Sequence, residues 1–159
     1  MSKGASQRSR ELFESGFYCA ESVLQALAES QGIHSDLIPR IASGFCSGMV
    51  RTGSMCGAVS GAILGIDLAA GRNLPAESIE PSYALAHKMI HLFELEYGSV
   101  NCRQLIGCDL ATEAGQHYFM ENNLMERCYQ YAEAATRMAL SLIAECELPS
   151  AEAGGFLVR

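Results

Sequence analysis

Seven cysteines are the residues of this sequence best suited to chemistry. They are Cys19, Cys46, Cys56, Cys102, Cys108, Cys128 and Cys146. An odd number of cysteines, in a chain that opens without an apparent secretory signal, argues against a framework of structural disulfides. In a reducing compartment such residues serve packing, redox chemistry or metal binding. We therefore expect a cytoplasmic protein whose cysteines are reduced.

Cys56 has the strongest local signal for reactivity. It leaves a glycine-containing loop and begins the segment Cys56-Gly57-Ala58-Val59-Ser60-Gly61, which is predicted to open a helix. The free backbone N–H groups and the dipole at a helix start favour a thiolate. Arg51 is near enough in sequence to add positive charge. We expect Cys56 to be an activated thiolate.

Glycines recur at every fourth residue around this helix start, at Gly53, Gly57, Gly61 and Gly65. Three of them form a bare stripe on one helix face. Each costs the helix up to about 1 kcal/mol relative to Ala, so something must approach the stripe closely. It is either a neighbouring helix, beside an inert buried Cys56, or a cofactor contacted by Gly57 and Gly61. The pattern alone leaves both interpretations open.

Segments 16–24, 42–45, 56–62 and 93–109, in that order, resemble a family of redox-active proteins. The family is named for a Cys, Cys-Gly-Ala-x-x-Gly, Cys, Cys pattern. The resemblance implies a small bacterial or archaeal protein with a redox or metal role, and an iron–sulfur site has been suggested for a similar domain. It places the four family cysteines on Cys19, Cys56, Cys102 and Cys108. Tyr18 and Cys46 depart from the residues expected there, Asn and Gly.

Thiol–disulfide chemistry is the first functional hypothesis. Cys56 is the predicted reactive thiol, Cys102 or Cys108 its resolving partner, and Cys19 a fourth sulfur nearby. On one unbroken helix the Cα atoms of Cys102 and Cys108 would lie about 9 Å apart, beyond the roughly 7 Å limit for a disulfide. They can meet only if the helix ends at Gly107. Such an oxidoreductase would act on a redox partner protein or a small thiol.

Two alternatives use the same residues differently. The thiolates of Cys19, Cys56, Cys102 and Cys108 could bind an iron–sulfur cluster or zinc as an electron-carrier domain. Their spacing matches no familiar finger or ferredoxin pattern, and so neither supports nor forbids such a site. The third hypothesis is a non-catalytic helical module whose glycine stripe packs a second subunit in a homodimer.

The remaining candidates favour structural interpretations. Cys128 and Cys146 are predicted to be buried packing residues, and Cys46 is a possible partner for Cys56. His87, His91 and Glu94 share one face of a predicted helix, a spacing that can bind metal but is more typical of a solvated face.

Composition excludes several classes of protein. Hydrophobic residues make up 49% of the 159 residues and charged residues 18%, which indicates a globular chain. The formal charge of −7 argues against nucleic-acid binding, because phosphate recognition needs clustered Lys and Arg. The longest apolar run, 58–66, is too short to span a membrane.

The spacing of apolar residues, together with the residues that start and stop helices, predicts the elements that must position the cysteines. Helices are expected over 10–30, after Ser35, over 56–70 and 81–97, between Asn101 and Gly107, and over 123–146, with a loop over 44–55. The helix over 56–70 is apolar nearly all round and should be buried. The prediction is an all-α multihelical bundle around this glycine- and alanine-rich helix, forming one domain over 1–159 with loose ends at about 1–8 and 149–159.

Overall fold

The computed structural model describes residues 2–148. Its α-helices are α1 (Ser2–Glu14), α2 (Cys19–Ser30), α3 (Cys46–Arg51), α4 (Gly57–Ala70), α5 (Glu80–Tyr97), α6 (Cys102–Ile106), α7 (Glu113–Glu121) and α8 (Met125–Glu147), with a 3₁₀ helix η1 (Arg40–Phe45). The described part of the chain has no strand, only an isolated antiparallel bridge between Met55 and Asn101. The predicted all-α class is confirmed.

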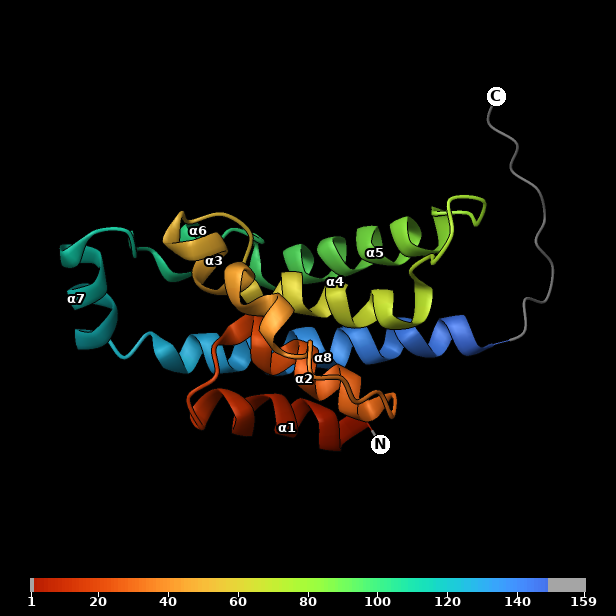
Figure 1. Cartoon of the computed structure of the whole chain (residues 1–159). Coiled ribbons are helices and arrows are strands. Elements are labelled where there is room, and N and C mark those ends of the chain that lie inside the picture. Colours follow the sequence, from red (N-terminus) through yellow and green to blue (C-terminus); the bar gives the residue numbers. More distant parts are fainter. Residues whose placement is uncertain (1, 149–159) are drawn as a thin grey trace, which may run out of the picture.

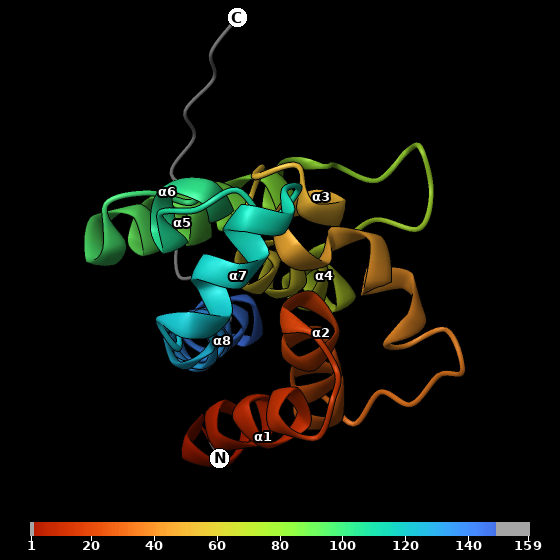
Figure 2. The same ribbon diagram turned by 90° about the vertical axis from the view of Figure 1, so that its left-hand side faces the viewer.

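The long helix α8 forms the spine of the bundle (Figure 1). Helices α1, α2, α4 and α5 all pack against α8, and α2 also packs directly against α4. Helices α3, α6 and α7 gather at one end, where α7 crosses in front of the bundle (Figure 2). The N-terminal ends of α2, α4 and α8 also lie at this end of the bundle, beside the short helix α6 (Figure 1).

The predicted central helix is α4, which packs against α2, α5 and α8. Its first six residues, 57–62, are all buried. The glycine stripe faces α2: a Cβ added at Gly61 would lie 2.6 Å from the carbonyl oxygen of Ala20, and one at Gly65 would overlap Leu27. Of the two interpretations of the stripe, tight packing of a neighbouring helix accounts for it.

The first predicted helix is wrong. The chain forms two helices instead of one over 10–30, because it turns between Glu14 and Cys19 with Gly16 at φ 116°. Cys19 consequently begins a helix instead of lying inside one. Most of the segment 1–8, expected to be loose, belongs to α1, and the expected loose end at 149–159 lies outside the described residues.

Helices α4, α5, α6 and α8 agree with the sequence prediction to within a few residues. Gly98 and Gly107 adopt the left-handed conformation and end α5 and α6, as glycine does at a helix C-terminus. Helix α7 was not predicted. Its signal is Thr112, whose hydroxyl accepts a hydrogen bond from the amide of Gly115 at 3.0 Å and caps the helix.

The segment predicted as a loop over 44–55 contains a left-handed turn. Five consecutive residues of α3, 47–51, have φ between 51° and 69°. For residues other than glycine this conformation costs about 1–2 kcal/mol each. The turn is held by the carbonyl of Gly48, which accepts hydrogen bonds from the amide of Ser54 at 3.0 Å and the hydroxyl of Thr52 at 2.9 Å.

No helix within residues 2–148 combines the length and the apolar character needed to cross a membrane.

Candidate functional site

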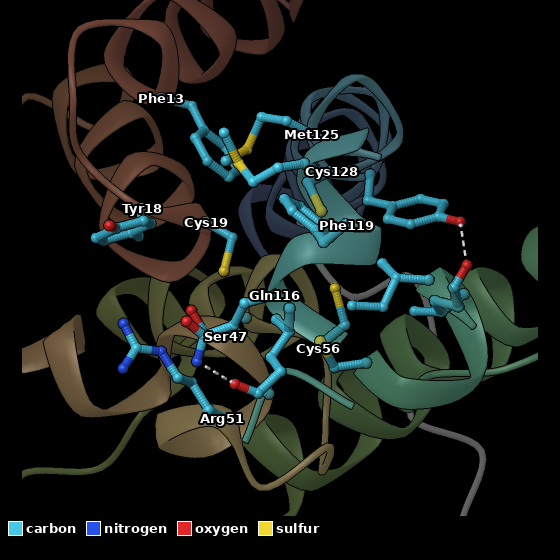
Figure 3. A pocket seen from close by; sticks show the side chains of 18 residues that line it. Phe13, Tyr18, Cys19, Ser47, Arg51, Cys56, Gln116, Phe119, Met125 and Cys128 are labelled. Carbon is cyan, nitrogen blue, oxygen red and sulfur yellow. Dashed lines mark hydrogen bonds between the residues drawn. The ribbon is translucent and has the colours of Figure 1, made fainter. Parts of the chain in front are cut away.

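Four cysteines line one cavity of about 230 Å³ at the end of the bundle where α7 crosses. They are Cys19, Cys56, Cys102 and Cys128. Figure 3 shows Cys19 approaching this space from the α2 side and Cys128 from the α8 side, with Cys56 opposite them. The tertiary structure therefore brings together sulfur atoms from four separate helical elements.

Each of these cysteines lies at the start of a helix. Cys19 and Cys102 are the first residues of α2 and α6, Cys56 is the N-cap of α4, and Cys128 is the fourth residue of α8. Unpaired backbone N–H groups and the positive end of the helix dipole occur at such positions. Several helix starts thus converge on one cavity.

Cys56 and Cys102 are joined through the backbone. The amide of Cys56 donates to the carbonyl of Val100 at 2.7 Å, and the amide of Cys102 donates to the carbonyl of Ser54 at 2.8 Å. These two hydrogen bonds flank the Met55–Asn101 bridge. The bridge fixes the starts of α4 and α6 side by side, with a cysteine at each.

Burial keeps these thiols protonated, contrary to the predicted activation of Cys56. Burial raises the pKa of Cys56 to about 12, although the backbone N–H groups of Ala58 and Val59 act in the opposite direction. Burial also raises the pKa of Cys102 to about 11. The helix-start environment expected from the sequence is present, but the loss of solvation outweighs it.

The rest of the cavity wall is largely apolar. It includes Phe13 from α1, Leu105 from α6, Phe119 from α7 and Met125 from α8. Within the described part of the chain, Arg51, the last residue of the left-handed turn, is the one charged side chain in the lining. The sequence placed Arg51 near Cys56 by proximity along the chain, and the structure places both on the same cavity.

Comparison with protein-family models gives a match over residues 17–142 to the family described as "Putative redox-active protein (C_GCAxxG_C_C)". The chain belongs to this family. The match includes all four cysteines that the resemblance singled out. Searches among curated proteins and among solved structures find no match.

Three of the four cysteines predicted from the family pattern line the cavity, and Cys108 does not. Cys108 follows Gly107, where α6 ends as predicted, so Cys102 and Cys108 do not share one unbroken helix. A charge on Cys108 nevertheless raises the pKa of Cys102. Cys108 packs against the core that includes Cys102 but does not line the cavity.

Cys128 replaces Cys108 in the cavity lining. A packing role was predicted for Cys128, because its position on the apolar stripe of α8 carries no signal for any other. Burial raises its pKa, and charges on Cys56 and Cys102 raise it further. Cys128 thus belongs electrostatically to the same group of thiols.

The other two cysteines also differ from prediction. Cys46 is buried in a cluster against which Cys19 packs, and its thiol donates to the carbonyl of Ala42 at 3.7 Å. Its neighbour is thus Cys19 instead of Cys56. Cys146, expected to be buried, is exposed in the last turn of α8.

The possible metal ligands on α5 are solvated. His87, His91 and Glu94 are all exposed, which agrees with the interpretation of a solvated face. Among residues 2–148, no group of three or more His, Cys, Asp or Glu side chains is arranged to hold a metal ion. All seven cysteines are free thiols.

Proposed function

We propose that this protein carries out thiol–disulfide exchange with Cys56 and Cys102 as the redox pair. The observation that carries the proposal is the backbone bridge that sets these two helix-start cysteines side by side on one cavity. Membership of a family described as redox-active supports it. Cys108, six positions after Cys102, is the reserve resolving thiol, and Cys19 is a further sulfur of the cavity.

The exchange proceeds in two displacements. The thiolate of Cys56 attacks one sulfur of a partner disulfide, forming a mixed disulfide and releasing the other half as a thiolate. The thiolate of Cys102 then attacks the Cys56 sulfur and releases the second half. Two electrons pass from the protein to the partner, and the two protons of the cysteine thiols are taken up by the released thiolates. The partner is a redox protein or a small thiol in its disulfide form.

The high pKa values make the resting pair slow to react. With its pKa raised to about 12 by burial, the Cys56 thiol carries little thiolate at neutral pH. The pair is consequently protected from unspecific oxidants, and reaction requires a partner that enters the cavity and favours the thiolate.

Peptide mapping after controlled oxidation tests the proposal. The protein is titrated with a dithiol/disulfide buffer, and each disulfide is identified by mass spectrometry. At equilibrium with the buffer a reversible Cys56–Cys102 disulfide should form, and Cys56→Ser should abolish it. Cys146→Ser, at an exposed site, is the matched control and should leave it unchanged. If Cys56 forms no disulfide with Cys102 at any ratio of dithiol to disulfide, the proposal is incorrect.

A second candidate function is metal binding, favoured by the four thiols that line one cavity without a carboxylate among them. The side chains as arranged do not form a ligand group, so an ion would have to draw the thiols together and displace their protons. Anaerobic purification followed by metal analysis and a visible spectrum separates the candidates. Stoichiometric zinc, or absorption from iron–thiolate bonds, would favour this alternative over disulfide exchange.

A further inference from the structure

We propose that the cavity binds a small, largely apolar disulfide that carries an anionic group, with Arg51 pairing with the anion. This proposal rests on the proposed function and names the class of its substrate. It requires three features of the cavity: apolar walls, one accessible cation, and thiols within the same enclosure.

The walls select for an apolar body. Phe13, Phe119, Leu105 and Met125 come from four different helices and surround the thiols. Among residues 2–148, neither an acidic residue nor a lysine lines the cavity. Its volume of about 230 Å³ lies below the roughly 300–1,000 Å³ typical of sites for drug-sized molecules. One half of an aromatic disulfide, the size of a substituted ring, fits this space better than a peptide disulfide does.

Arg51 selects for an anion. It is exposed, and no carboxylate of the described residues forms a salt bridge with it, in contrast to Arg8, Arg10, Arg103 and Arg137. A guanidinium at the rim of an apolar cavity is suited to a carboxylate or sulfonate, which it can bind through two parallel hydrogen bonds. The converging helix starts add positive potential on the same side of the molecule.

The left-handed turn is what places Arg51 in the wall. Residues 47–51 keep an unfavourable backbone conformation, and three of them, Ser47, Gly48 and Arg51, line the cavity. Strain of this kind persists where surrounding structure holds it and is concentrated at ligand sites. Here Gly48 packs directly on Cys102, which couples the turn that carries the cation to one of the two proposed redox thiols.

The reaction is thiol–disulfide exchange by Cys56 and Cys102, with the apolar anionic disulfide as the substrate. The apolar disulfide enters with its anionic group at Arg51, and its sulfur–sulfur bond is attacked by Cys56. One half leaves as a thiolate, and Cys102 releases the other half as it closes the Cys56–Cys102 disulfide. The ligand is reduced to two thiols and the protein is oxidised by two electrons.

Two aromatic disulfides that differ in charge test the proposal. The probes are 5,5′-dithiobis(2-nitrobenzoate), with a carboxylate on each half, and the uncharged 4,4′-dithiodipyridine; both release coloured thiols. Rates are measured in a Cys146→Ser background, which removes the exposed thiol. Arg51→Gln should slow the anionic probe by about tenfold and change the neutral probe by less than about twofold.

Two further variants keep the result specific. Arg51→Lys retains the charge and should restore much of the preference for the anionic probe. Arg72→Gln removes an exposed arginine that follows the opposite end of α4 and should change neither rate. If Arg51→Gln slows both probes equally, or slows neither, the proposal that the cavity prefers an anionic disulfide is wrong.

Non-reactive competitors test the two recognition elements separately. Cyclohexanecarboxylate should protect Cys56 and Cys102 from alkylation by iodoacetamide, whereas acetate and cyclohexanol, which keep only the charge or only the apolar body, should not. Equal protection by cyclohexanol would overturn the role of Arg51. Failure of the proposed function is a different result: no Cys56–Cys102 disulfide would form with either aromatic probe.

Discussion

Cys56 and Cys102 lie diagonally across the Met55–Asn101 bridge, and each starts a helix one residue beyond it. Their amides are hydrogen-bonded to the opposite segment, at 2.7 Å for Cys56 and 2.8 Å for Cys102. The two cysteines are 46 positions apart along the chain, but the bridge makes their backbones neighbours. Both cysteines line the same cavity.

Stability should fall at alkaline pH because of the buried thiols. The pKa of Cys56 is raised to about 12 and that of Cys102 to about 11, whereas both titrate near 8.5 in the unfolded chain. Between these values the unfolded state binds fewer protons, so the free energy of unfolding decreases as the pH rises. Each thiol contributes a slope of up to about 1.4 kcal/mol per pH unit.

Urea denaturation of Cys56→Ala between pH 8 and pH 11 measures that slope, because the variant lacks one titrating thiol. Its stability should fall less steeply with pH than that of the natural sequence. Cys146→Ala, at an exposed site, should change the slope less. Parallel curves for Cys56→Ala and the natural sequence would contradict the effect of burial on Cys56.

Gly61→Ala should destabilise the protein, although alanine is the better helix former. An added Cβ would lie 2.6 Å from the carbonyl oxygen and 2.9 Å from the Cα of Ala20, and backbone atoms cannot rotate away. We expect a loss of about 1–3 kcal/mol from overpacking. Gly4→Ala, in α1 with no atom within 4 Å of the new Cβ, should instead stabilise by up to about 1 kcal/mol. Thermal denaturation of both variants checks the opposite signs.

Val50 tests the left-handed turn. It has φ 51° and is 67% exposed, so replacement affects the backbone more than packing. Val50→Gly should be more stable than Val50→Ala by about 1 kcal/mol, because glycine adopts this conformation without a steric cost. At Leu95, an exposed site in α5, the order should be reversed. The same order at both positions in chemical denaturation would contradict the turn.

Tyr131 holds α6 to α8 and should influence Cys102. Its hydroxyl donates to the carbonyl of Leu105 at 3.2 Å in a buried setting. Tyr131→Phe keeps the ring and leaves that carbonyl without this donor, which should cost about 1 kcal/mol. Looser attachment of α6 should also speed alkylation of Cys102 relative to Cys19. Tyr118→Phe, at an exposed position of α7, is the control and should change neither property.

Much of the fold was predictable because it depends on local signals. Gly98 and Gly107 end their helices in the left-handed conformation, which the sequence indicates directly. The apolar character of 56–70 predicted a buried helix, and α4 is that helix. The missed break at Gly16 and the missed helix α7 show the limit: a glycine can interrupt an apolar stripe, and a short polar helix has little periodicity to detect.

The sequence by itself determined the helical class, the helix starts at Cys56 and Cys102, and the resemblance to a redox-active family. Only the tertiary structure decided that Cys128 lines the cavity and Cys108 does not, and that burial raises the pKa of Cys56 and Cys102. The physical reason is the distance along the chain over which each property is determined. A helix start depends on a few adjacent residues, whereas burial, and hence the pKa of a thiol, depends on helices that are distant along the chain and meet only after folding.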